Sequence, residues 1–418
     1  MTDIPSRAGD AERRRTLAHW ISGQAERVRW DGIEPAGWHA LLDAARRERV
    51  APLVYHVSEA TGWPAGVPDV LRAELRELYY GTTGSNVVLY SELARILNAL
   101  EKPVVLLKGA ALATALYPSV GLRPMSDLDL LVPRSRVADS VAALAPLGYR
   151  AASPQPAPGL SAETQYHIAL HGGPRESVAV EIHWSLIGGE GDWRAPPIDW
   201  FWSRTEDWTA PASATSSVRL RRGEAGSFSA TPRARQLDPT AHLLYLAAHL
   251  MLQHGSGQAP LIWFYDVHLL VEQLRDRIDW RELARQARRL HWSGALAGTL
   301  RAANELFGTV LLAGFLESVA LPHDPRAEKV LADKSAPLES KGDFVWNELR
   351  CLDTRGRFRL ATSILFPSAD YLRWRYAPRP GWLWPAWYLY RWAVVIRQAS
   401  RTLARRAAKK LTPVRRTT

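Results

Sequence analysis

Residues 126–132 read Ser-Asp-Leu-Asp-Leu-Leu-Val and place Asp127 and Asp129 at the start of an apolar run. Side chains two residues apart in a β-strand point to the same face, so the two carboxylates should project together. Two like charges side by side cost free energy unless a cation neutralises them, and hard oxygen ligands suit Mg²⁺. The stretch therefore predicts a strand that presents a metal-binding pair; the alternative is two surface aspartates at a strand end.

The segments around this pair favour the metal-binding interpretation. Residues 104–107, Val-Val-Leu-Leu, predict a buried strand that ends at Lys108-Gly109. Arg123 lies in the loop that approaches the aspartates, and Glu181 lies within a third predicted strand, residues 178–184. Lys108 and Arg123 are candidates for contacts with phosphate, and Glu181 is a candidate third metal ligand. The alternatives are a solvent-exposed lysine, a structural salt bridge and an edge-strand charge, respectively.

The rest of the chain reads as helical on both sides of these strands. Residues 69–99 predict two helices around Gly81 and Gly84, and Ser135 begins a predicted helix that runs to Leu147. Residues 205–235 read as a loop or an edge hairpin. Further helices are predicted at 241–253, 261–274, 280–290 and 295–307.

This order predicts an α+β fold, with a mixed sheet and helices flanked by N- and C-terminal helical regions. The predicted divisions are a helical region at 1–100, a core at 101–235, a helical domain at 236–380, and an aromatic then basic tail at 381–418.

The charge distribution and the cysteine content exclude some classes of protein for this chain. The net charge is +11, but residues 397–418 hold eight basic and no acidic residues, so the remaining chain carries only +3. This tail could contact an anionic surface or RNA, or could be a solvated terminus. The single Cys351 excludes an intrachain disulfide framework, and residues 1–15 lack the apolar segment of a secretory signal, so we expect a cytoplasmic protein. The chain has no P-loop motif.

Several other polar residues are expected to stabilise the fold rather than to bind a ligand. His183 shares the face of Glu181 and is expected to support it or to be structural. His249 and His254 are five residues apart, which is not the i, i+4 spacing of a metal-binding pair on an α-helix, so they are expected to be structural. Asp266 is expected to pair with a buried partner.

Three segments resemble the bacterial family known as uncharacterised nucleotidyltransferases, within the DNA polymerase beta superfamily. They are residues 104–111 (VVLLKGAA), 121–132 (GLRPMSDLDLLV) and 181–184 (EIHW). With weaker segments up to Leu372, the resemblance covers most of residues 40–375. Its specific part is the Lys-Gly…Arg-Pro-Met-x-Asp-x-Asp core.

The resemblance implies a site and a reaction. Gly109 matches the superfamily's glycine, Asp127 and Asp129 match its paired carboxylates, and Glu181 matches its third carboxylate. The implied cofactor is Mg²⁺ (or Mn²⁺), and the implied substrate is a nucleoside triphosphate such as ATP. An acceptor hydroxyl on a small molecule, peptide or protein would take the nucleotidyl group, with release of pyrophosphate. Lys108 or Arg123 would neutralise charge on the triphosphate.

The sequence departs from the superfamily pattern at one point. This chain has Gly109-Ala110 where Gly-Ser or Gly-Gly is common, and seventeen residues separate Gly109 from Asp127. The alternative function is therefore a catalytically inactive module of the same fold that binds nucleotide or a partner.

Overall fold

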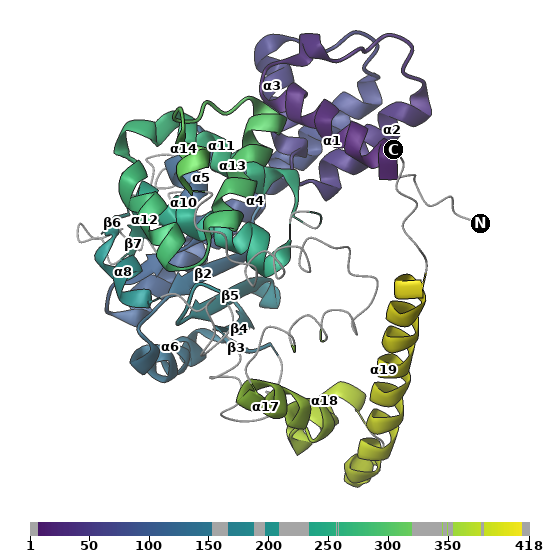
Figure 1. Cartoon of the computed structure of the whole chain (residues 1–418), viewed down its shortest axis with the longest axis vertical. Coiled ribbons are helices and arrows are strands. Elements are labelled where there is room, and N and C mark those ends of the chain that lie inside the picture. The colour runs from purple at the N-terminus through teal and green to yellow at the C-terminus, as the bar shows by residue number, and fades with distance from the viewer. Residues whose placement is uncertain are drawn as a thin grey trace.

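The computed structural model describes residues 7–152, 166–187, 197–208, 234–255, 257, 259–319, 345, 349, 354–377 and 380–411. The N-terminal part consists of the α-helices α1 (Arg7–Ile21), α2 (Pro35–Arg47), α3 (Ala51–Thr61) and α4 (Asp69–Leu100). Figure 1 shows α1, α2 and α3 as a group at one end, with α4 reaching from them into the rest of the molecule.

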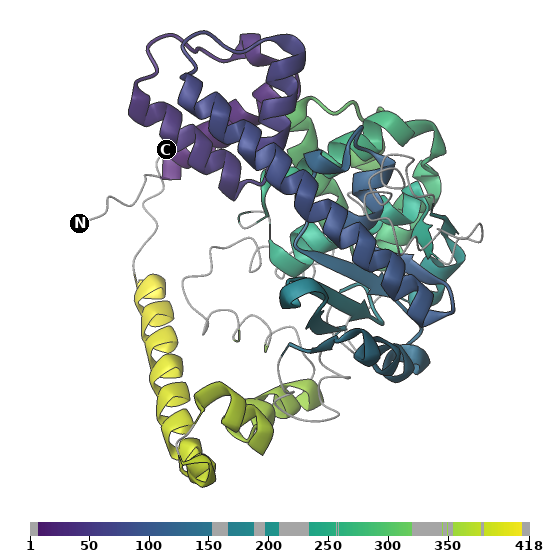
Figure 2. The same cartoon turned by 180° about the vertical axis from the view of Figure 1, so that it is seen from behind.

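Helix α4 is a single helix of 32 residues, so the prediction of two helices around Gly81 and Gly84 is wrong. Each glycine costs an exposed helix interior only about 1 kcal/mol relative to alanine. Packing at both ends outweighs this cost, since Leu71 and Leu75 lie in one hydrophobic core and Leu93 lies in another. Figure 2 shows α4 running from the N-terminal helices across to the sheet.

A seven-stranded mixed sheet follows, in the order β3-β4-β5-β2-β1-β7-β6. Strand β2 pairs in parallel with β5, and β1 pairs in parallel with β7, while the other neighbours are antiparallel. The predicted fold class is therefore confirmed. The strands are β1 (Val104–Leu106), β2 (Asp127–Leu131), β3 (Arg150–Ala151), β4 (His167–Gly172), β5 (Val178–His183), β6 (Thr205–Asp207) and β7 (Ala234–Leu237).

The two faces of the sheet belong to different cores. Leu128 and Leu130 of β2 pack with Val180 and Ile182 of β5 in the core that holds the second half of α4. Leu131, on the opposite face, belongs to the core of the C-terminal helices. Because side chains alternate along a strand, Asp127 and Asp129 lie on the same face as Leu131.

Helices α5 (Lys108–Ala115), α6 (Val137–Leu144) and α8 (Ile198–Ser203) connect the strands. The helix predicted at 135–147 is shorter than expected, because 3-10 turns occupy Arg134–Arg136 and Ala145–Leu147. Gly148 ends this segment at φ 90°, as predicted for a left-handed position. The predicted edge hairpin at 205–235 is represented by the antiparallel pair β6 and β7, and residues 209–233 lie outside the described residues.

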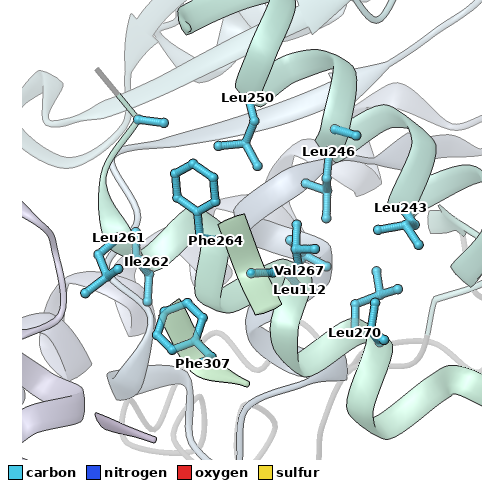
Figure 3. Close-up of a cluster of buried hydrophobic side chains, with 14 of the residues drawn as sticks. Leu112, Leu243, Leu246, Leu250, Leu261, Ile262, Phe264, Val267, Leu270 and Phe307 are labelled. Atoms are coloured by element: carbon cyan, nitrogen blue, oxygen red, sulfur yellow. The ribbon is translucent and has the colours of Figure 1, made fainter. Parts of the chain in front are cut away.

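The C-terminal helices pack on the face that carries the aspartates. They are α10 (Pro239–Ala248), the π-helix η7 (His249–His254), α11 (Leu261–Leu274), α12 (Trp280–Arg289), α13 (Ser293–Phe307) and α14 (Phe315–Val319). Figure 3 shows side chains of α10 and η7, such as Leu246 and Leu250, facing Phe264 and Val267 of α11 with Leu112 of α5 among them.

The last described elements are α17 (Thr354–Leu365), α18 (Ala369–Tyr376), the 3-10 helix η9 (Gly381–Ala386) and α19 (Trp387–Leu411). The start of α19 is held to the end of α17 because Trp392 Nε1 donates to the Leu365 carbonyl at 2.8 Å. Within the described ranges, no helix is both long enough and apolar enough to cross a bilayer.

Candidate functional site

Three carboxylates meet on neighbouring parallel strands. The register of β2 and β5 places Asp129 directly beside Glu181, and Asp127 lies one pleat earlier on the same face. One oxygen from each of the three side chains lies within 4.8 Å of the others. The structure thus brings together the three residues that the sequence indicated as metal ligands, and carboxylate oxygens are the ligands that Mg²⁺ prefers.

The three carboxylates differ in their surroundings. Burial and the neighbouring Asp129 raise the pKa of the half-buried Asp127. Asp129 is only 2% exposed. Burial alone would raise its pKa, but Lys108 and His183 hold the pKa of Asp129 well below its usual range. Burial also opposes ionisation of Glu181, yet a hydrogen bond with His183 leaves the pKa of Glu181 lowered. Asp129 and Glu181 are therefore charged at neutral pH.

Lys108 is the cation of this cluster. Its Nζ donates to Asp129 Oδ1 at 2.9 Å, and burial of the ammonium is outweighed by Asp129, which raises the pKa of Lys108 well above its usual value. Lys108 is the first residue of α5 and has φ +44°, a left-handed conformation that strains a residue with a Cβ.

Two histidines complete the cluster. His183 is fully buried, and its Nε2 lies 2.8 Å from Asp129 Oδ1 and 3.1 Å from Glu181 Oε2. Burial lowers the pKa of His183, but these two hydrogen bonds outweigh it, so the pKa is raised. His183 therefore supports both carboxylates, as its position two residues after Glu181 suggested.

His167 was not identified from the sequence. It lies opposite His183 in the antiparallel pair β4 and β5, and its Nε2 is 3.6 Å from Glu181 Oε1. Burial and the neighbouring His183 lower the pKa of His167 to about 4, so its ring is neutral at pH 7. The available signal was the placement of His167 and His171 on one strand face, with Ile168 and Leu170 on the other, which is compatible with a half-buried strand.

Arg123 lies in a buried ion pair behind the carboxylates. Its Nε and Nη2 donate to the two oxygens of Asp266 at 2.8 and 2.7 Å, and the Tyr117 hydroxyl donates to the same carboxylate at 2.7 Å. Asn86 of α4 donates to the Arg123 carbonyl at 2.8 Å. The structure thus places Arg123 in the salt bridge that was the alternative to its phosphate contact. The buried partner predicted for Asp266 is Arg123.

Gly109 has a steric reason to be glycine. A Cβ at this position would lie 2.6 Å from Arg123 Nη1 and 3.0 Å from Met125 Cγ. Such distances are too short for a side chain, so the absence of a Cβ lets Arg123 pack against the first turn of α5. This turn also carries Lys108, and its backbone N–H groups begin a helix, where anions are stabilised.

The π-helix η7 and the end of α10 cover the cluster. Tyr245 and His249 are both buried, and the charges of Lys108 and Asp129 act on each of them. Burial and Lys108 lower the pKa of His249 well below its usual value. Gln253 donates to the Tyr166 hydroxyl at 2.7 Å, which ties η7 to the start of β4.

His249 and His254 pack against each other and against Trp263, in keeping with the structural role expected for them. Their ring centroids are 4.6 Å apart, and both rings contact Trp263 at about 5 Å. In a π-helix the hydrogen bonds join residues five apart, so a five-residue spacing returns to the same side. The π-helix thus explains a contact that α-helical spacing does not predict.

A family model described as an uncharacterised nucleotidyltransferase matches residues 34–308, about two thirds of the chain. The chain belongs to this family. The matched range of this nucleotidyltransferase contains the carboxylates, Lys108 and both histidines of the cluster, and it ends after α13. It does not extend to residues 365–372, which the resemblance in sequence had included. No curated protein and no solved structure matches the chain.

Proposed function

We propose that this nucleotidyltransferase is a metal-dependent enzyme of the DNA polymerase beta superfamily. It moves a nucleoside monophosphate from a nucleoside triphosphate to an acceptor hydroxyl and releases pyrophosphate. The observation that supports this proposal is the meeting of Asp127, Asp129 and Glu181 on one face of β2 and β5.

The residues present fit a divalent cation. Three carboxylates and one ammonium, that of Lys108, leave two negative charges in the cluster when the histidines are neutral. A bound Mg²⁺ would balance these charges and would neutralise charge that develops on the phosphates during transfer. Asp127, Asp129 and Glu181 would supply the oxygen ligands.

The chain's own residues then have the following roles. Glu181, which is ionised and partly exposed, accepts the proton of the acceptor hydroxyl as the acceptor oxygen attacks the α-phosphorus. The bond between the α-phosphorus and the bridging oxygen breaks, and pyrophosphate leaves with that oxygen. Lys108 keeps Asp129 ionised and places a positive charge near the triphosphate.

The alternative function is a nucleotide- or partner-binding module without catalysis. It is favoured by Gly109-Ala110, since this chain lacks the hydroxyl of a Gly-Ser motif. It is also favoured by the 2.9 Å contact between Lys108 and Asp129, because this contact neutralises a carboxylate without a metal.

One assay separates the two functions. The purified chain is incubated with each α-labelled nucleoside triphosphate, Mg²⁺ or Mn²⁺, and pools of candidate acceptors. We expect transfer of the label that falls at least about 100-fold in Asp127→Asn and Asp129→Asn, since each removes a charged ligand.

The matched control is Asp139→Asn, an exposed aspartate of α6. Transfer that survives both ligand substitutions contradicts the metal site. Binding of triphosphate without transfer in any combination supports the non-catalytic alternative.

We also propose that the basic C-terminal region, residues 397–418, contacts an anionic lipid surface. Helix α19 exposes Leu389, Ile396 and Leu403, each more than half exposed. Their seven-residue spacing places them along one side of the helix, while Arg397 and Arg401 project elsewhere. An apolar stripe beside basic residues is typical of helices that lie in a membrane interface. Residues 412–418 lie outside the described residues.

The test is sedimentation with vesicles of phosphatidylglycerol and, separately, of phosphatidylcholine. We expect binding to the anionic vesicles only, and its loss after deletion of residues 397–418 or after Ile396→Glu. Val70→Ser, which removes an exposed apolar side chain of α4, is the control. Binding to RNA but to neither vesicle would contradict the lipid proposal.

A further inference from the structure

The carboxylate cluster is flanked by nitrogen donors on one side. His167 and His183 face each other across β4 and β5, with ring centroids 5.0 Å apart. Glu181 lies between them, and each of its two oxygens faces one ring nitrogen. Oε1 is 3.6 Å from His167 Nε2, and Oε2 is 3.1 Å from His183 Nε2.

These separations suit atoms that share one metal ion. Two donors bound at about 2.0–2.2 Å with angles near 90–110° lie roughly 3.0–3.5 Å apart. The distance of 3.6 Å between His167 Nε2 and Glu181 Oε1 is too long for a hydrogen bond. The donor atoms of His167, Glu181 and His183 all lie within 4.8 Å of one another.

Polar groups without partners lie on the same side of the sheet. The hydroxyl of Tyr245 and Nδ1 of His249 are buried and have no hydrogen-bond partner within the described part of the chain. Buried polar atoms are normally paired, so such atoms indicate a ligand or water that they contact. Both residues lie close enough to Asp129 and Lys108 for the charges to interact. Two buried polar groups beside the cluster therefore remain available to a polar ligand.

We propose that His167, Glu181 and His183 hold a first-row transition-metal ion, such as Mn²⁺ or Zn²⁺, through two imidazole nitrogens and one carboxylate. Imidazole suits Zn²⁺ and carboxylate suits Mn²⁺, and this ligand set offers both donors, whereas Mg²⁺ favours ligand sets made only of oxygen. The proposal deepens the proposed function, because Glu181 belongs to both ligand sets. Asp127 and Asp129 then remain for the cation that accompanies the triphosphate.

The experiment uses the full chain and Mn²⁺ alone, without nucleotide. Pulsed electron paramagnetic resonance of bound Mn²⁺ detects the coupling of directly bound ¹⁴N. We expect a nitrogen coupling in the unsubstituted chain, its reduction in His167→Ala and His167→Gln, and a fall in Mn²⁺ affinity on the order of tenfold or more. Zn²⁺ should displace the Mn²⁺.

The matched control is His171→Ala, because His171 lies on the same face of β4 and is exposed. It should leave the coupling unchanged. Circular dichroism verifies that each variant is folded, and two different substitutions of His167 guard against a local folding defect. Bound Mn²⁺ without nitrogen coupling, or a coupling that both His167 variants retain, overturns the proposal.

The result is independent of the transferase assay. Label transfer with Mg²⁺ but no nitrogen coupling would leave the proposed function standing and remove this site. Nitrogen coupling without label transfer under any condition would support this metal site and contradict the proposed transferase function.

Discussion

The position of the Arg123 side chain requires that residue 109 has no Cβ. Arg123 cannot move easily, because its guanidinium is buried and bonded twice to Asp266. We expect Gly109→Ala to lower the free energy of unfolding by about 1–3 kcal/mol, since its Cβ would lie 2.6 Å from Arg123 Nη1. Urea unfolding followed by tryptophan fluorescence measures this change. An unchanged midpoint would show that the first turn of α5 can shift without loss.

Individual residues of the site were predictable to different degrees. The i, i+2 rule sufficed for Asp127 and Asp129, because both lie on one strand. Glu181 required a second strand, whose apolar pattern at 178–184 was visible in the sequence, and the family resemblance then matched it to the third carboxylate. His167 was missed because the strand that carries it follows a Pro-rich segment and begins close to it. No local pattern could show that Arg123 meets Asp266, 143 residues further along.

Helix α4 gives a prediction at the scale of elements. Gly84 is exposed in the middle of the helix, and a Cβ there meets no atom within 4 Å. We expect Gly84→Ala to raise the free energy of unfolding by about 0.5–1 kcal/mol, because alanine restricts the unfolded chain and favours the helix. The measurement is the same urea titration, compared directly with Gly109→Ala. Destabilisation by Gly84→Ala would mean that the helix bends there in solution.

Elements with strong local patterns were predicted well, and elements that depend on tertiary packing were not. Strands β1, β2 and β5 and helices α11 to α13 lie close to their predicted ranges. Two elements, η7 and β3, could not be recognised from the local sequence pattern. The π-helix η7 replaces the last turn of a predicted α-helix, and hydropathy cannot distinguish the two. Strand β3 has only two residues and depends on β4 for its pairing.

The stability of the whole molecule should fall in acid, because neutral histidines are buried in several places. Burial and Arg123 lower the pKa of His242 to about 3, and burial and His183 lower that of His167 to about 4. The unfolded chain, with histidine pKa near 6.5, binds these protons more readily. Their contribution to stability is therefore complete above pH 6.5 and is lost as the pH falls towards the folded values.

We expect His242→Phe to reduce this loss. For His242 alone, the loss between pH 7 and pH 5 amounts to about 2 kcal/mol. The measurement is the free energy of unfolding at pH 7 and pH 5 for the unsubstituted chain, His242→Phe and the exposed control His56→Gln. An equal loss in all three would contradict a buried neutral His242.

Helix α4 links the N-terminal helices to the loop that precedes Asp127. Its 32 residues make a rod about 48 Å long, with one end in the core that the N- and C-terminal helices share and the other in the core beside the sheet. A rotation of about ten degrees around the middle of such a rod moves each end by about 4 Å. Asn86, just beyond the exposed glycines, holds the Arg123 carbonyl in the loop that leads into Asp127. Any swing of the N-terminal helices is thus either absorbed by bending at Gly81–Gly84 or delivered to the loop that positions the carboxylates.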